Sequence, residues 1–474
     1  MQQQGPGPGT RGTGRDGGRT APRLYLDNAA TSFPKPAAVT EAMVRFAGEV
    51  GASPGRGSYA ESRAAGGILR TCRQRINRLI GGESPDHVVF ALNTSDALNV
   101  AIKGVVWKAA KQRSSKAANG RGQGGRGVNG RVHLVTTWMD HNSVLRPFNA
   151  LREFWGDFER GGLIDVTWAR ADPATGIVDP AEVAAAIRDD TALVAVVHTS
   201  NVTGSIQPVG EIGRLCRERA RGAGAGGPLL LVDAAQSLGH VPIDVQAMEI
   251  DLLAFPGHKG LLGPLGTGGL YIRPGVEERM VTLREGGTGS ASERDVQPGW
   301  MPDRFEPGSH NTIGIAGLSE GAAWLLGRGI GGPDGVRAHE EGLMRAFLSV
   351  LTPEALDRAG LRLLGTREID RRVGVFAFTH ESIDAERFAE RLEHEHGVLV
   401  RAGLHCAPLA HRTFGTDPET ARESAAPHGA FRLSFGPFNT EADAERAARA
   451  VLAVARTEAR SRSPFFSGHT LASP

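Results

Sequence analysis

Cysteine and long apolar runs are both scarce in this sequence. Its three cysteines, Cys72, Cys216 and Cys406, are too few for a disulfide framework, and no CxxC pair indicates a zinc or redox site. No stretch approaches the roughly 20 apolar residues that a membrane-spanning helix requires. We therefore expect a protein of the reducing cytoplasm, with no membrane anchor and no bound metal.

An excess of charge of either sign is also missing. Lys and Arg number 54 against 52 Asp and Glu, which leaves a formal net charge of +2. That balance gives no indication of nucleic acid or an anionic membrane as a partner. The 40% of hydrophobic and 22% of charged residues are typical of a globular protein with a sizeable core.

Four segments are predicted to lie outside the regular elements of the fold. Residues 1–22 are rich in Gly, Pro and Arg and are predicted to be a disordered tail without the apolar segment of a secretory signal. Their arginines leave a transit peptide as an alternative. We interpret residues 112–130 as a surface loop insertion, although its basic residues could contact RNA or a partner. A shorter Gly-rich stretch covers 221–227, and residues 461–474 form a second tail.

Between these segments, short apolar runs alternate with helical patterns. Residues 61–80 place Ile68, Cys72, Ile76 and Leu79 on one helical face. This alternation predicts a mainly parallel sheet covered on both faces, in a large domain over 23–300. The predicted strands are 87–92, 132–138, 163–169, 192–200, 228–236 and 251–255. The first strand is followed by a predicted helix that ends at about residue 110. Further helices are predicted over 144–155, 180–190 and 209–220.

The pattern changes after about residue 300. Strands are expected at 374–380, 398–403 and 431–436, with helices at 384–395 and 440–457. Their order predicts a separate, smaller α+β domain over 301–460.

The stretch 229–271 carries the most specific chemical signal. Asp233 follows a buried strand directly, at the carboxyl end where open α/β sheets bind ligands. About two dozen residues later, Lys259 lies in the sequence Gly-His-Lys-Gly. Alone, such an Asp is usually a helix cap and such a Lys is usually just exposed. The two together are far more specific.

This joint pattern resembles the class V aminotransferase family of pyridoxal-phosphate (PLP) enzymes of fold type I. Within it, the chain looks like the group II (SUF-type) cysteine desulfurases over roughly residues 24–454. The resemblance implies a Schiff base between PLP and Lys259, Asp233 against the pyridinium nitrogen, and Gln236 against the ring oxygen. An aspartate there keeps the ring able to accept electrons from the substrate Cα, and the lysine amine exchanges with the substrate amine. The implied large domain has a mainly parallel sheet of the seven-stranded type.

A phosphate site is expected where Asn93-Thr94-Ser95-Asp96 opens a helix, because free N–H groups and the helix dipole suit an anion. By itself this segment is only a helix cap. The resemblance implies phosphate contacts from Thr94, Ser95 and His258. Pro256 departs from the family, which usually has Ser or Thr there, so one hydroxyl contact is missing. Thr288 resembles the residue that reaches the phosphate of the neighbouring subunit, which implies a homodimer.

The resemblance also implies residues around the substrate. His141 matches the histidine that stacks on the PLP ring and relays protons, although a lone His after a strand is usually structural. Asn201 and Arg432 match contacts to the substrate carboxylate, which the planar fork of Arg binds well. A surface Arg at a strand start is the alternative for Arg432.

Cys406 separates a desulfurase from other PLP enzymes. It lies in Arg-Ala-Gly-Leu-His-Cys-Ala-Pro-Leu (401–409), which resembles the nucleophile loop of group II desulfurases, with Leu404 in place of a common His. Arg401, a further expected substrate contact, and His405 should surround the thiol with groups that favour thiolate. Cys72 and Cys216 fit buried apolar positions instead.

The implied reaction converts L-cysteine to L-alanine, leaves a persulfide on Cys406, and passes the sulfur to an acceptor protein by thiol exchange. Selenocysteine lyase, aminotransferase and epimerase activities are alternatives, because they share Lys259 and Asp233, and L-selenocysteine is then the other candidate substrate. A non-catalytic scaffold is a further alternative, which the joint retention of the site residues disfavours.

Overall fold

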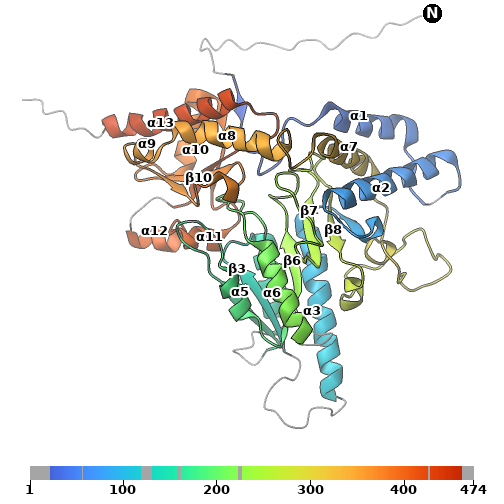
Figure 1. Ribbon diagram of the computed structural model, residues 1–474. Helices are drawn as coiled ribbons and strands as arrows, with labels where there is room; N and C mark the ends of the chain where they lie inside the picture. The colour runs from blue at the N-terminus through green and yellow to red at the C-terminus, as the bar shows by residue number, and fades with distance from the viewer. Residues whose placement is uncertain are drawn as a thin grey trace, which may run out of the picture.

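A seven-stranded sheet forms the centre of the computed structural model, which describes residues 22–55, 57–118, 131–156, 162–222, 227–424 and 428–461 (Figure 1). The strands from β7 to β4 run parallel, and β8 is antiparallel to both of its neighbours. The predicted fold class, with its mainly parallel sheet, is confirmed. The strand order is β2 (Val88–Ala91), β8 (Gly268–Ile272), β7 (Leu252–Pro256), β6 (Leu229–Asp233), β5 (Thr191–Val197), β3 (Val132–Thr137) and β4 (Ile164–Ala169).

Helices cover both faces of this sheet, which explains why its central strands β5, β6 and β7 are largely apolar. In β6, Leu230 and Val232 enter one hydrophobic core, and Leu229 and Leu231 enter the other. The first core is closed by α2 (Ala60–Leu79), α5 (Pro180–Ala186), α6 (Val209–Gly222) and α7 (Thr312–Arg328), and the second by α3 (Thr94–Ala118) and α4 (Asn142–Trp155).

A second, antiparallel sheet has its own core, rich in phenylalanine. Its strands are β12 (Arg401–Gly403), β13 (Ala430–Ser434), β10 (Val375–His380) and β9 (Leu361–Leu364). Beside it, β1 (Leu24–Tyr25) pairs in parallel with β11 (Val398–Leu399). The nearby helices are α8 (Val336–Val350), α9 (Pro353–Asp357), α10 (Ala385–His396), α11 (Pro408–Thr413), α12 (Pro418–Ser424) and α13 (Glu441–Ser461) (Figure 1).

The structure corrects several sequence predictions. The sequence analysis did not predict β8, β9, α7 or α8. The loop expected from residue 112 is wrong for 112–118, since α3 continues to Ala118. Residues 119–130 lie outside the described part, as do 1–21, 223–226 and 462–474. After residue 300, α7 packs on α1 (Ala37–Arg45) and α2. The division of the chain at that residue stays a prediction. No described helix combines the length and apolarity needed to cross a bilayer.

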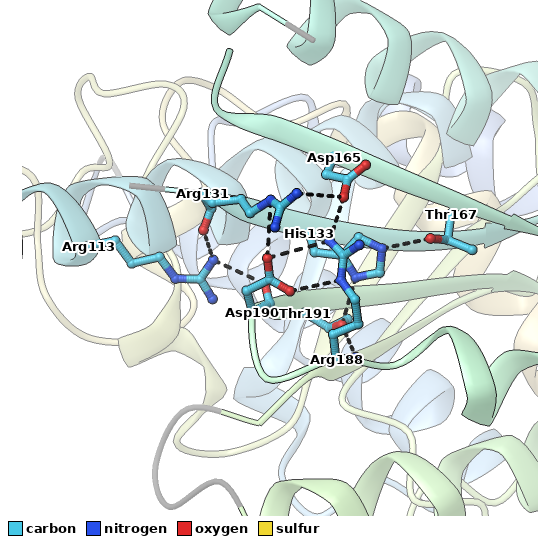
Figure 2. Close-up of polar contacts among 8 residues, drawn as sticks. All are labelled: Arg113, Arg131, His133, Asp165, Thr167, Arg188, Asp190 and Thr191. Atoms are coloured by element: carbon cyan, nitrogen blue, oxygen red, sulfur yellow. Dashed lines mark hydrogen bonds and ion pairs between the residues drawn. The ribbon is translucent and has the colours of Figure 1, made fainter. Parts of the chain in front are cut away.

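A polar network closes the amino-terminal edge of the parallel strands (Figure 2). Arg188 bonds Asp165 at 2.6 Å and Asp190 at 3.0 Å, and Arg113 on α3 donates to the Asp190 carbonyl at 3.1 Å. At its centre, the buried His133 ring contacts the hydroxyls of Thr191 and Thr167 at 2.8 and 2.9 Å. These contacts join the start of β3 to β4 and β5.

His133 makes the fold sensitive to acid. Its burial, with a smaller effect of Arg188, lowers its pKa from 6.5 to about 4. Between those two pH values the unfolded chain binds a proton at this residue and the folded chain does not, so acid favours unfolding. Below about pH 4 both states are protonated at this residue, so its contribution to the free energy of unfolding no longer changes with pH.

We expect the free energy of unfolding to fall as pH drops from about 6.5 to 4. One such histidine contributes at most about 1.4 kcal/mol per pH unit. Thermal unfolding of wild type and His133→Gln across this range measures it, and the variant should show the shallower slope. Parallel curves would contradict the assignment.

Candidate active site

A cavity of about 410 Å³ lies at the carboxyl edge of the central sheet, where β5 and β6 end. Its walls come from segments far apart in the sequence, including the turn after β1, the first turns of α3 and α4, and strands β12 and β13. Ten of the residues predicted for the site line it, namely Thr94, Ser95, His141, Asn201, Asp233, Gln236, His258, Lys259, Arg401 and Arg432.

Lys259 and Asp233 face the same cavity and influence one another. Burial lowers the pKa of Lys259 to about 8, and Asp233 opposes that shift. Burial raises the pKa of Asp233 to about 6, against the Ala235 N–H, which donates to Oδ1 at 2.9 Å, and the charge of Lys259. Gln236 donates through Nε2 to the Ala29 carbonyl at 2.8 Å, which fixes its amide at the cavity wall.

His141 caps the amino terminus of α4. Its Nδ1 accepts from the Ser143 N–H at 3.1 Å, so the ring proton is on Nε2. Burial, with smaller effects of the Lys259 and Arg401 charges, lowers the pKa of His141 to about 4. The ring is therefore neutral at pH 7.

The amino termini of two helices meet at one end of the cavity. Thr94 and Ser95 open α3, and the Ser95 hydroxyl lies 2.7 Å from that of Ser143 on α4. The sequence analysis missed Ser143, although its place two residues after His141 at a helix start was a usable signal. Nδ1 of His258 is buried without a partner among the described residues, and burial lowers the pKa of His258 to about 4. These donors suit an anion.

Arg432 holds the other side of the cavity. Although almost fully buried, its guanidinium donates to the Asp27 carboxylate at 2.7 Å and to the Asn201 carbonyl at 2.9 Å. Nε has no partner in the described part of the chain. Asp27, which the sequence analysis also missed, neutralises part of this charge. The remaining N–H groups of Arg432 are available to a carboxylate.

Cys406 is exposed beside the cavity rather than among its lining residues. Nη2 of Arg401, a lining residue, lies 3.5 Å from its Sγ. The expectation that His405 also surrounds the thiol is wrong: its ring is buried and contacts His411 at 3.3 Å. Burial keeps the pKa of His405 well below 6.5, so the ring carries no charge to the thiol.

Thr288 is not brought to this site. It lies between β8 and α7, where its hydroxyl contacts Ser290 at 2.9 Å, and it is not among the described residues that line the cavity. Its implied contact with a neighbouring subunit stays a prediction.

Comparison with known proteins gives the family. The family model for class-V aminotransferases matches residues 24–447. The chain belongs to this family. A probable cysteine desulfurase of Methanothermobacter thermautotrophicus is 33% identical over 404 residues, 83% of this chain and 88% of that protein. A cysteine desulfurase of Yersinia pseudotuberculosis is 30% identical over 432 residues, 90% of this chain and 91% of that protein.

Solved structures give the same result. A cysteine desulfurase from Thermococcus onnurineus superposes with a TM-score of 0.74 at 28% identity, covering 92% of this chain and 95% of that one. A class-V aminotransferase implies PLP, and this cavity fits it. It has an amine in Lys259, a carboxylate across from it in Asp233, and buried polar atoms of His258 and Arg432 without partners among the described residues.

The lowered pKa of Lys259 predicts how the cofactor-free protein takes up PLP. The neutral amine is the nucleophile, so the rate of Schiff base formation should rise through about pH 8 instead of about 10.5. Asp233→Asn removes the carboxylate that raises this pKa, so its profile should move to lower pH. Stopped-flow absorbance after mixing with PLP measures both profiles, and a wild-type midpoint near 10.5 would contradict the assignment.

Proposed function

We propose that this protein is a PLP-dependent cysteine desulfurase, which converts L-cysteine to L-alanine and holds the sulfur as a persulfide on Cys406. The observation that carries the proposal is the exposed Cys406 thiol at 3.5 Å from Arg401, a residue of the cavity wall. The guanidinium can donate to the sulfur and so hold it at the edge of the cavity. A transaminase or epimerase needs no such thiol.

The cavity residues divide into those for the cofactor and those for the substrate. Lys259 would hold PLP covalently, Asp233 its ring nitrogen and Gln236 its ring oxygen. Thr94, Ser95 and His258 would hold its phosphate. When bound, PLP supplies the electron sink that makes the Cα proton of the substrate acidic. Arg432 and Asn201 would bind the substrate carboxylate.

Proton transfer is assigned to two groups. Nζ of Lys259, with its pKa of about 8, exists partly as the free amine near neutral pH and can take the Cα proton. His141 is neutral and presents its Nε2–H, because Nδ1 is engaged by the Ser143 amide. It can orient a polar group or donate a proton without adding a positive charge to the cavity.

The sulfur transfer is a displacement at the sulfur atom of the substrate. The Cys406 thiolate attacks the substrate sulfur, a new S–S bond forms, and the Cβ–S bond breaks. The electron pair of that bond remains on the carbon, which takes up a proton as alanine forms. An acceptor thiol then removes the outer sulfur by exchange. Because Cys406 is exposed, an acceptor protein can reach it from outside.

We also propose that the protein is a cytoplasmic homodimer, with Thr288 reaching the phosphate of the neighbouring subunit. Cys72, Cys216 and Cys406 are all free thiols, which is what a reducing compartment maintains.

Replacing the nucleophile tests the function. Wild-type protein with PLP, dithiothreitol and L-cysteine should yield alanine and sulfide in equal amounts. Cys406→Ala should lose nearly all of both, while Cys216→Ala should retain them. A Cys406→Ala variant as active as wild type would contradict the proposal. Activity of that variant on L-selenocysteine alone would indicate a selenocysteine lyase.

Pro256 gives a test of the phosphate site. It is buried at the end of β7, where the family usually has a hydroxyl. Pro256→Ser should bind PLP about tenfold more tightly, because a hydrogen bond to a charged group contributes roughly 1.5–3 kcal/mol. Fluorescence titration of the cofactor-free protein measures this, with Pro256→Ala as the control for loss of the ring. Equal PLP affinities for Pro256→Ser and Pro256→Ala would show that a hydroxyl at this position does not contact the phosphate.

A further inference from the structure

The loop that carries Cys406 contains an unfavourable backbone turn. His405 and Cys406 have φ values of 50° and 58°, and the Ala407 N–H donates to the Leu404 carbonyl at 3.0 Å across them. They are adjacent left-handed residues, and neither is glycine. Each such residue costs about 1–2 kcal/mol relative to a right-handed one. Contacts outside the turn must therefore hold this conformation.

Two asparagines hold the turn by its carbonyl groups. Nδ2 of Asn201, after β5, donates to the His405 carbonyl at 2.6 Å. The backbone N–H of Asn142, at the start of α4, donates to the Cys406 carbonyl at 2.8 Å. Both donors belong to the segments that form the cavity, so the turn is tied to the active-site wall.

The His405 side chain holds the turn from the opposite direction. Its ring lies beside that of His411 on α11, with the ring centroids 5.5 Å apart and the planes at 22°. Nδ1 of His405 lies 3.3 Å from Nε2 of His411, and Nδ1 of His411 lies 2.8 Å from the Thr416 hydroxyl. All three side chains are buried, with exposed fractions of 2% or less.

Only one direction of hydrogen bonding satisfies this chain of groups. Nε2 of His405 lies 3.4 Å from the Arg401 carbonyl, which can only accept, so Nε2 carries the proton. His405 Nδ1 must then accept from His411 Nε2–H, which leaves His411 Nδ1 as an acceptor for the Thr416 hydroxyl at 2.8 Å; the His411 carbonyl, at 3.2 Å, is the longer contact of that hydroxyl. Burial, which lowers the pKa of His411 to about 4, keeps this ring neutral as well.

We propose that His405 and His411 are positioning residues for the nucleophile. Their hydrogen-bonded pair holds the left-handed turn so that the Cys406 thiol stays beside Arg401 at the edge of the cavity. This role rests on the proposed function of Cys406. The hydrogen-bond partner of Sγ is Nη2 of Arg401 at 3.5 Å, whereas the two imidazoles bond to one another, to the Arg401 carbonyl and to the Thr416 hydroxyl. The pair therefore acts through the backbone and not on the substrate.

The test compares two replacements of His411 in the PLP-loaded protein. His411→Leu has a similar volume but cannot donate to His405, whereas His411→Gln keeps an N–H donor at the corresponding place. We expect His411→Leu to lower kcat for alanine about 10- to 100-fold, the loss expected when a reacting group moves by about 1 Å. KM for L-cysteine should change less than threefold, because Arg432 keeps its bonds to Asp27 and to the Asn201 carbonyl. His411→Gln should recover most of kcat.

Thiol reactivity gives a second measurement that needs no turnover. The rate of Cys406 alkylation by iodoacetamide at pH 7, followed by peptide mass spectrometry, should fall several-fold in His411→Leu because the thiol leaves Arg401. The buried Cys72 and Cys216 should remain slow and serve as internal references. The absorbance of bound PLP should match wild type.

Two further variants separate positioning from general stability. His380→Leu removes another buried histidine of the same region, on β10, whose Nδ1 accepts from the Ser382 and Ile383 N–H groups at 3.1 Å. It should leave kcat and alkylation unchanged. Thr416→Val keeps the volume and removes the donor to His411, so it should show a smaller loss of kcat than His411→Leu. It replaces His411→Leu as the test if that variant does not fold.

The outcomes distinguish the two proposals. Unchanged kcat and alkylation in both His411→Leu and Thr416→Val, with an inactive Cys406→Ala, would overturn the positioning role alone. Equal losses in His380→Leu would overturn it as well. A fully active Cys406→Ala would overturn the proposed function. It would overturn the positioning role with it, because Cys406 would then not be the nucleophile.

Discussion

The buried guanidinium of Arg432 is the contact on which the architecture of the cavity depends. It lies on β13 of the small sheet, yet it donates to Asp27 after β1 and to the Asn201 carbonyl after β5. A buried charge is tolerated only when it is paired and hydrogen-bonded, so these partners are required by the burial itself. The pairing fixes the small sheet against the carboxyl edge of the large one, and the cavity is the space left between them.

Burial then sets the charges within this space. It lowers the pKa values of His141 and His258 to about 4, so neither imidazole adds a positive charge at neutral pH. The cationic side chains that remain among those described at the cavity are Arg401, Arg432 and the partly protonated Lys259. Anionic groups are thus attracted to these three side chains, while the two imidazoles remain neutral. One pocket can then bind a phosphate and a carboxylate and still hold a free amine.

The sequence was informative where a residue type and its spacing express a chemical requirement. The spacing of Asp233 and the Gly-His-Lys-Gly motif led to the family resemblance that implied roles for Asp233, Gln236 and Lys259, and all three line the cavity. The fold class followed from strand and helix periodicity. Asp27 was missed because its importance comes from its contact with Arg432, far away in the chain.

The error at His405 has a backbone origin. Proximity in sequence suggested that its ring would lie against the Cys406 thiol, but two successive left-handed residues turn the ring into the interior. The positive φ values of His405 and Cys406 are held by contacts with Asn201, Asn142 and His411, which lie elsewhere in the fold. Sequence periodicity also did not predict that α7 packs against α1 and α2, because that packing depends on contacts between segments far apart in the chain.

The parallel pairing of β1 with β11 has a consequence for how the protein is made. Ala29 and Ala30, just after β1, line the cavity, but the strand that β1 pairs with lies near the other end of the chain. A ribosome therefore releases the first cavity segment long before its partner exists. The emerging chain can build its parallel strands early, yet the cofactor pocket closes only when translation is nearly finished. In this arrangement closure of the pocket is a late event in biogenesis, and a chain cut short before β12 and β13 lacks two of its walls.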